Sequence, residues 1–142
     1  MNVQKIIFEN YGPFYGKHTL DTYVTYDKPL ILFKAENDVA KTSILQSVSF
    51  ALYGTLSTRE KEKNSKLQKR KIINRRAAME KSPENSQKTS VQIVFTHGNS
   101  NDQWTITRTL EFKPTKELDL NTEWSDEDLP EIINEETKIM RG

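Results

Sequence analysis

Apolar and polar positions alternate along four stretches of this chain, a pattern that predicts β-strands. These stretches lie at residues 1–10, 17–26, 89–95 and 103–112. A fifth strand is expected at residues 29–33, where a continuous apolar run indicates burial on both faces of a sheet. The polar residues 97–102 between the last two alternating stretches favour a β-hairpin with a longer loop.

One further stretch has the spacing of a helix. Apolar side chains recur at helical intervals between residues 42 and 53, and Gly54 follows where a helix C-terminus favours glycine. We expect the strands and this helix to enclose a common core. Its predicted members are Phe8, Leu32, Leu45, Val48, Phe95 and Trp104.

Two long stretches lack sustained periodicity. Residues 55–88 offer only a short helix around 67–78 and otherwise read as a weakly ordered basic insertion. Residues 113–142 are acidic, with Trp124, Ile132 and Ile133 as their apolar anchors. The pattern therefore predicts an ordered lobe at 1–112, which contains the insertion, followed by an acidic tail or connector.

Composition agrees with an ordered lobe that carries polar segments. The chain has 142 residues, of which 35% are apolar and 29% charged. The absence of cysteine excludes disulfides and thiolate metal sites. No apolar run approaches membrane-spanning length and the N-terminus lacks a signal-peptide pattern, so a soluble, cytoplasmic protein is expected.

Charge is distributed unevenly although the net charge is only +1. Residues 59–88 contain eleven Lys and Arg against four Glu, whereas residues 116–142 contain nine acids against three bases. A basic loop suits the backbone of DNA, since phosphate contacts need charge without fixed geometry. The alternative is an ordinary solvated loop. The candidate DNA-binding residues are Lys69, Arg70, Lys71, Arg75 and Arg76.

The strongest chemical motif follows the apolar run at 29–33. A phosphate-binding P-loop has the pattern G-x-x-x-x-G-K-[ST], and here Lys41 and Thr42 are present while Ala35 and Ala40 occupy the glycine positions. In this interpretation Lys41 reaches the β- and γ-phosphates of ATP and the Thr42 hydroxyl ligates Mg²⁺. The candidate nucleotide-binding residues are Asn37, Asp38, Val39, Ala40, Lys41, Thr42 and Ser43.

Two features of this loop weaken the nucleotide interpretation. Alanine at a position that needs a positive φ is strained by about 1–2 kcal/mol, so replacing Ala40 with glycine is expected to strengthen binding. Asp38 adds a negative charge close to the phosphates. The alternative is a strand–turn–helix in which Ala-Lys-Thr-Ser occurs by chance. We expect weak, Mg²⁺-dependent binding of ATP.

The order of these elements resembles a known family. The sequence FENYGPFYG at 8–16, the P-loop, FALYG at 50–54, INRR at 73–76 and TITR at 105–108 occur in the order found in SMC-like, ABC-type ATPase heads. Within that superfamily the chain is most similar to the DNA sulfur-modification ATPase DndD and related bacterial defence ATPases. The resemblance covers residues 1 to about 112.

The resemblance implies an α/β fold: the N-terminal half of a P-loop ATPase head, with a mixed sheet, one P-loop helix and a β-hairpin. It places the turn at residues 10–17 near the adenine and ribose, and it makes the acidic tail a connector toward a coiled coil. The implied partners are DNA, bound without sequence preference, and the C-terminal half of the head or a second subunit.

The resemblance also bears on catalysis. In such heads the signature motif and the Walker B carboxylate lie in the second half, so no catalytic residue is assigned in this chain and no turnover is expected from it alone. The competing hypothesis is a non-catalytic DNA-binding or protein-interaction module with a degenerate nucleotide site. No spacing of His18, His97 and acidic residues suggests zinc.

Overall fold

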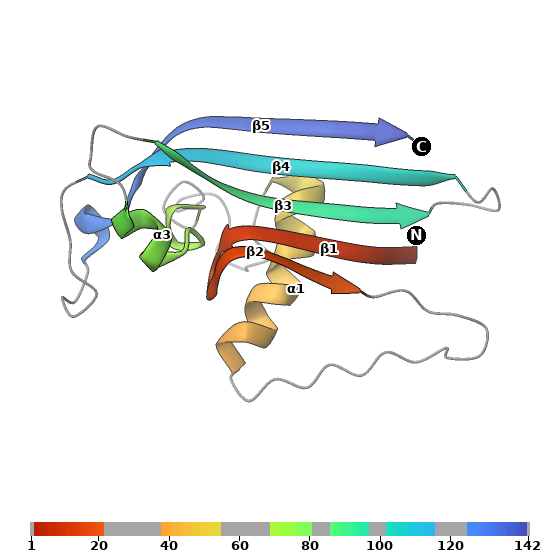
Figure 1. Cartoon of the computed structure of the whole chain (residues 1–142), viewed down its shortest axis with the longest axis horizontal. Coiled ribbons are helices and arrows are strands. Elements are labelled where there is room, and N and C mark those ends of the chain that lie inside the picture. Colours follow the sequence, from red (N-terminus) through yellow and green to blue (C-terminus); the bar gives the residue numbers. More distant parts are fainter. Residues whose placement is uncertain are drawn as a thin grey trace.

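The computed structural model describes residues 2–21, 38–54, 69–80, 86–96, 102–115 and 125–141. The described strands form one five-stranded sheet with the order β2-β1-β3-β4-β5, and every pairing among them is antiparallel. Figure 1 shows the strands of this sheet lying side by side. The strands are β1 (Asn2–Tyr11), β2 (Phe14–Asp21), β3 (Gln87–Thr96), β4 (Gln103–Lys113) and β5 (Glu131–Arg141).

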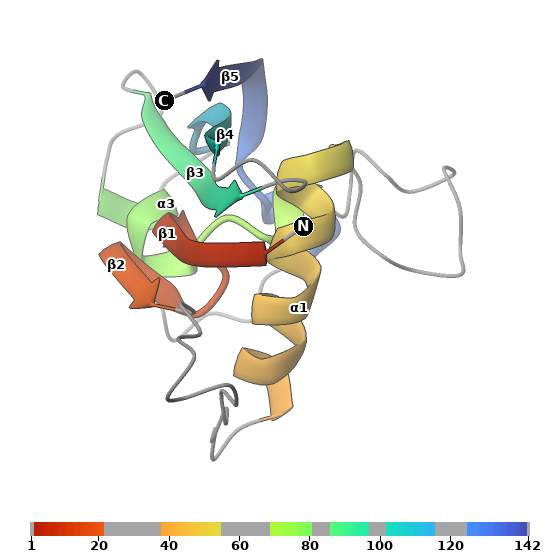
Figure 2. The same cartoon turned by 90° about the vertical axis from the view of Figure 1, so that its right-hand side faces the viewer.

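Helix α1 (Asp38–Tyr53) covers one face of the sheet, where it packs against β3 and β4 (Figure 2). The main core lies between them, because alternate side chains of β3 point toward α1 while their neighbours face away. Its buried members include Ile6, Phe8, Tyr11, Phe50, Ala51, Val91, Ile93 and Leu110. We call the sheet face opposite α1 the outer face.

A second, smaller cluster lies at one end of the sheet. Helix α3 (Arg75–Glu80) packs Ala77 and Ala78 against Phe112 and Ile73. Just before β5, the short 3-10 helix η1 (Asp126–Asp128) leads into Pro130, which is buried.

The four alternating stretches are confirmed as strands where the structure describes them. β2 begins three residues earlier than expected because the turn at Gly12 and Pro13 is tight. Gly12 has a φ of +52°, which lets Phe14 pair with Tyr11 immediately. The antiparallel pairing of β3 with β4 confirms the hairpin, whereas residues 22–26, 29–33 and 97–101 lie outside the described residues.

The acidic stretch contains a strand that the sequence pattern did not reveal. β5 pairs with β4 along its whole length, from Trp104 opposite Arg141 to Lys113 opposite Glu131. The register shifts near Ile133, and this irregularity interrupts the alternation that would have marked a strand. On the α1 side of β5, moreover, Glu135 and Thr137 stand where apolar residues would be expected.

The helix expected at 67–78 is two pieces. Residues 69–71 are helical, the chain then extends through Ile73, and α3 begins at Arg75. The interruption has a clear cause, since Ile73 forms a bridge with Tyr11 and the Asn74 amide donates to the Asn10 carbonyl at 2.9 Å. Pairing with the end of β1 therefore overrides helical propensity here.

Of the predicted core residues, Phe8 and Phe95 are buried, and Val48 and Trp104 pack against the core. Leu45 was predicted wrongly, because it is 73% exposed. The N-terminal end of α1 extends past the β2 edge of the sheet (Figures 1 and 2). Leu45 is exposed because it lies on a face of the helix that points away from the sheet, whereas Ile44 and Val48 pack against the core. Leu32 and Trp124 lie outside the described residues.

Candidate functional site

The candidate nucleotide site lies at the beginning of α1. The helix starts at Asp38, four residues before its predicted start, so Lys41 and Thr42 lie in its first turns. The first N–H groups of an α-helix have no intrahelical partner and point outward from its positive end. A helix start with a lysine and a threonine in these positions can hold an anion such as a phosphate. Asn37 lies outside the described residues.

The helical backbone corrects one expectation about Ala40. Ala40 is the third residue of α1, and Asn10 is the one non-glycine residue with a positive φ among those described. Ala40 therefore has ordinary right-handed backbone, and the predicted strain there is wrong. Glycine at this position would be a poorer helix former than alanine, so no gain in affinity is expected from it.

The turn between β1 and β2 is attached directly to the start of α1. The Tyr11 hydroxyl donates to the Ser43 carbonyl at 2.9 Å. A Cβ on Gly12 would lie 3.3 Å from the Ser43 Oγ, so the turn backbone reaches this side chain closely. The turn expected to accompany the nucleotide site is therefore adjacent to the residue that ends the candidate phosphate-binding set.

Hydrogen bonds fix the same turn to residues 72–74. The Gly12 amide donates to the Ile72 carbonyl, and the Asn74 side chain donates to the Gly12 carbonyl at 2.9 Å. Asn10 has a φ of +50° and its side chain bonds to both Gly16 and Lys88. The turn is thus a rigid platform beside α1.

Burial at this platform changes the acidity of Tyr11. The ring is 1% exposed and stacks on Phe8, with 5.4 Å between ring centroids. Burial raises the pKa of Tyr11 well above its ordinary value, because the phenolate would be desolvated. The hydroxyl therefore remains a hydrogen-bond donor to α1 over the whole physiological range.

Lys17 is the last residue of the turn at 10–17, which the resemblance places near the adenine and ribose. In the structure its side chain lies on the outer face of the sheet, opposite α1. Lys17 pairs with Glu9, whose neighbour Phe8 points into the core, so Lys17 shares the outer face with Glu9. There it lines a hollow of about 290 Å³ with polar side chains of β3, β4 and β5. Antiparallel sheets commonly leave one such polar face toward water.

No group of three or more acidic, histidine or cysteine side chains among the described residues is arranged to hold a metal ion. The His18 ring nitrogen lies 2.6 Å from the Tyr15 carbonyl, and His97 lies outside the described residues. The role of Thr42 as a Mg²⁺ ligand stays a prediction.

Five candidate DNA-binding residues lie at 69–76, which we call the basic segment. Lys69 forms an ion pair with Glu135 at 2.9 Å. Arg70 donates to the carbonyls of Leu129 and Pro130 at 2.7 and 2.9 Å. Lys69 therefore attaches the segment to β5 itself and Arg70 attaches it to the residues just before β5, an arrangement that a purely solvated loop would not have.

The other three cations of the basic segment are exposed: Lys71, Arg75 and Arg76. The Arg76 guanidinium lies 4.3 Å from the centre of the Tyr15 ring, a cation–π arrangement. Lys61, Lys63 and Lys66, which extend the cluster in the sequence, lie outside the described residues. The exposed cations are the part of the segment that an external phosphate can reach.

Arg108 and Glu135 are two polar residues whose importance the sequence analysis missed. Both lie on the α1 side of the sheet, opposite Thr137 and Leu110 respectively. The signal was available for Arg108, since a charged residue occupies an inward position between Ile106 and Leu110 of an alternating strand. Such a position in a strand needs a partner, and α1 provides one.

The described helices contain no segment long and apolar enough to cross a membrane. The AAA domain family matches residues 5–141. The chain belongs to this AAA domain family. The matched residues include β5, and the division into a lobe at 1–112 and a tail or connector at 113–142 stays a prediction.

A curated relative agrees with this family. Over 61 residues the chain is 34% identical to the SbcC component of the SbcCD nuclease of Vibrio cholerae serotype O1. That alignment covers 43% of this chain and 6% of the relative, so the chain corresponds to a small part of that protein. Together the two matches support an SMC-like, ABC-type ATPase head, and the described strands of this chain form an antiparallel sheet.

Proposed function

We propose that this chain is the ATP-binding N-terminal half of the head of an SMC-like ATPase that handles DNA. The observation that carries the proposal is the start of α1, where Lys41 and Thr42 occupy the first turns beside the rigid turn at Tyr11 and Gly12. A helix start combined with a lysine and a hydroxyl suits a triphosphate with Mg²⁺. Membership of the AAA domain family supports the same assignment.

Each residue of the site has a definite role in this proposal. The first N–H groups of α1 contact phosphate oxygens, Lys41 neutralises the β- and γ-phosphates, and the Thr42 hydroxyl ligates Mg²⁺. We expect binding without turnover, because no carboxylate of this chain is placed by a motif to orient a water molecule. The C-terminal half of the head or a second subunit would supply that group.

The DNA-handling part of the proposal rests on the basic segment and on the relative's name, which is that of a nuclease component. Its exposed cations, Lys71, Arg75 and Arg76, suit phosphate contacts that do not depend on sequence. A more specific proposal is a role in DNA sulfur modification, restriction or defence. It rests on the resemblance to DndD alone.

One observation favours the second candidate, a non-catalytic module with a degenerate nucleotide site. Because α1 already begins at Asp38, the amides of Thr42 and Ser43 fall within the regular helix, where they bond to earlier carbonyls. Fewer donors then remain for phosphate, and Asp38 brings a negative charge into the same first turn.

Thermal unfolding with and without Mg-ATP separates the two candidates. A ligand that binds only the folded state raises stability by about 2.7 kcal/mol when its concentration is about 100 times its dissociation constant. The ATPase proposal expects the midpoint to rise with Mg-ATP and much less with ATP in excess EDTA. A midpoint that does not respond to Mg-ATP at millimolar concentration favours the degenerate module.

DNA binding is tested separately by salt dependence. We expect weak binding to any duplex, with an affinity that falls steeply as salt rises, because the contacts release counterions. The combined change Lys71→Glu, Arg75→Glu and Arg76→Glu should weaken all duplexes similarly. We avoid Lys69 and Arg70 in this test, since both stabilise the fold through Glu135 and the carbonyls before β5. If the affinity for DNA does not change with salt concentration, or depends on the DNA sequence, the basic segment is not the DNA-binding site.

A further inference from the structure

β5 forms one edge of the described sheet. It pairs with β4 along one side, and no described strand pairs with its other side. From Asn134 to Arg141 the pairing with β4 is regular, so alternate residues direct their backbone N–H and C=O groups outward from the open side. The irregularity near Ile133 affects only the beginning of the strand. The regular stretch can therefore accept a further strand.

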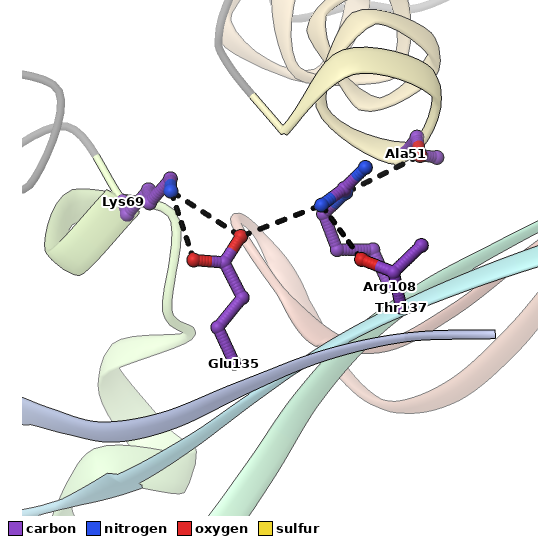
Figure 3. Close-up of polar contacts among 5 residues, drawn as sticks. All are labelled: Ala51, Lys69, Arg108, Glu135 and Thr137. Carbon is purple, nitrogen blue, oxygen red and sulfur yellow. Dashed lines mark hydrogen bonds and ion pairs between the residues drawn. The ribbon is translucent and has the colours of Figure 1, made fainter.

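Polar contacts on the α1 side of the sheet hold this edge in place (Figure 3). Arg108 donates from Nε to the Ala51 carbonyl at 3.3 Å and from Nη1 to the Thr137 hydroxyl at 2.8 Å. The Glu135 carboxylate lies 2.9 Å from the Lys69 Nζ and 3.6 Å from the Arg108 Nη1. A strand that its neighbours already hold on one side loses little further conformational freedom when it pairs on the other.

Exposed apolar side chains are concentrated on this edge strand. Five large apolar side chains are exposed in the described part of the chain, and three of them belong to β5. Ile133 is 44% exposed, Ile139 62% and Met140 60%. A proline would prevent pairing at an edge, and β5 contains none. These features favour a strand that a partner covers.

The order of side chains in β5 is complementary to itself. In an antiparallel pair about a two-fold axis perpendicular to the sheet, the same patch of both copies meets, and residues on the same face lie opposite each other. With the axis at Thr137, Glu136 lies opposite Lys138 in both directions, and Thr137 lies opposite itself. Opposite charges and threonine pairs both stabilise antiparallel strands. An axis at Glu136 or at Lys138 would instead place like charges opposite each other.

We propose that β5 pairs with β5 of a second copy of this chain, antiparallel about Thr137, so that two sheets join into one. Glu136 and Lys138 are exposed on the outer face, where their ion pairs form across the two copies. The interface is small, so the dimer is weak. β5 and β2 are opposite edges of the described sheet, and the start of α1 extends past the β2 edge (Figures 1 and 2). The pairing therefore leaves the candidate nucleotide site open and requires no nucleotide.

Charge reversal at the two outer-face positions tests this pairing independently of the proposed function. Sedimentation equilibrium of the full chain, at low salt and without nucleotide, measures the dissociation constant of the dimer. Glu136→Lys places cations opposite each other at two points, and Lys138→Glu does the same with anions. Each variant should weaken self-association by about tenfold or more. Lys88→Glu is the matched control, because it reverses one exposed charge on the outer face of β3, away from the edge, and should match the wild type.

An equimolar mixture of Glu136→Lys and Lys138→Glu gives the sharpest result. One copy of each variant restores both opposite-charge pairs, so the mixture should associate about as tightly as the wild type although neither variant does so alone. The variant that carries both changes also restores the pairs and decides the result if a single variant fails to fold. A wild type that stays monomeric, reversals without effect, or a mixture and a double variant that associate no better than the single variants overturn the inference.

Discussion

The two ends of α1 are held in different ways. At the C-terminal end, Phe50 and Ala51 are fully buried, and Arg108 and Gly54 complete the cap. At the N-terminal end the helix extends past the sheet edge and Leu45 is exposed, and the attachments there are the hydrogen bond from Tyr11 to Ser43, the close approach of Gly12 to Ser43 and the packing of Ile44 against the core. The anchored end thus stabilises the fold, and the projecting end carries Lys41 and Thr42, the residues with nucleotide chemistry.

Because of this difference, mutations in one helix should be able to change the stability of the fold and the binding of nucleotide separately. Changes at the anchored end should lower the free energy of unfolding, since they remove buried contacts. Changes at the projecting end should alter ligand binding and leave unfolding nearly unchanged.

The largest effect is expected from Phe50→Ala. The side chain is completely buried between α1 and the sheet, so its removal should cost about 3–5 kcal/mol of unfolding free energy. Leu45→Ala is the matched control in the same helix, and at an exposed position it should change stability by less than about 1 kcal/mol. Urea unfolding measures both. Similar losses in the two variants would mean that α1 is not anchored at one end.

Gly54→Ala should have the next largest effect. The positive φ alone costs alanine about 1–2 kcal/mol, and the Cβ would in addition meet Arg108. Gly16→Ala is the control, because Gly16 has the same φ of +75° with nothing within 4 Å of an added Cβ. The excess loss in Gly54→Ala over Gly16→Ala reports the close approach of Arg108. Equal losses in urea unfolding would contradict that approach.

Tyr11→Phe should have a smaller effect, about 1 kcal/mol, since it removes the hydrogen bond to Ser43 and keeps the buried ring. Its pH dependence is more informative. Because burial raises the pKa of Tyr11, the neutral form is favoured by folding, and this contribution is complete below the ordinary tyrosine pKa of about 10 and is lost above it. Between about pH 8 and about pH 11 the wild type should lose more stability than Tyr11→Phe. An equal loss would show that Tyr11 ionises normally.

The sequence allowed prediction of elements whose pattern arises from one buried face. β1, β3, β4 and α1 alternate or repeat because their inward residues meet one core, and this periodicity survives in the sequence. β5 was not predicted because two of its inward positions hold the polar residues Glu135 and Thr137 instead of apolar ones. Glu135 pairs with Lys69, and Thr137 accepts a hydrogen bond from Arg108. Partners of this kind are distant in the sequence, so no local sequence pattern reveals the interaction.

The candidate site could be predicted only in part, from residue types that recur at a fixed spacing. Lys41 and Thr42 are recognisable because a phosphate loop needs those residue types next to a helix start. The first turn of α1 at Asp38, and hence the ordinary backbone of Ala40, could not be foreseen, since the P-loop pattern assumes a loop at this place. The contacts of Lys69 and Arg70 involve β5 and the residues before it, so they could not be predicted once β5 had been missed.

The central claim, that the projecting end of α1 binds ATP, is tested most directly by calorimetry with Mg-ATP on three proteins. The wild type should bind weakly, and Lys41→Ala should bind about tenfold or more weakly than that, because it loses the lysine of the P-loop motif. Lys88→Ala, which changes an exposed lysine on the outer face, should match the wild type. A wild type that binds no Mg-ATP, or a Lys41→Ala variant that binds as well as Lys88→Ala, would contradict the account.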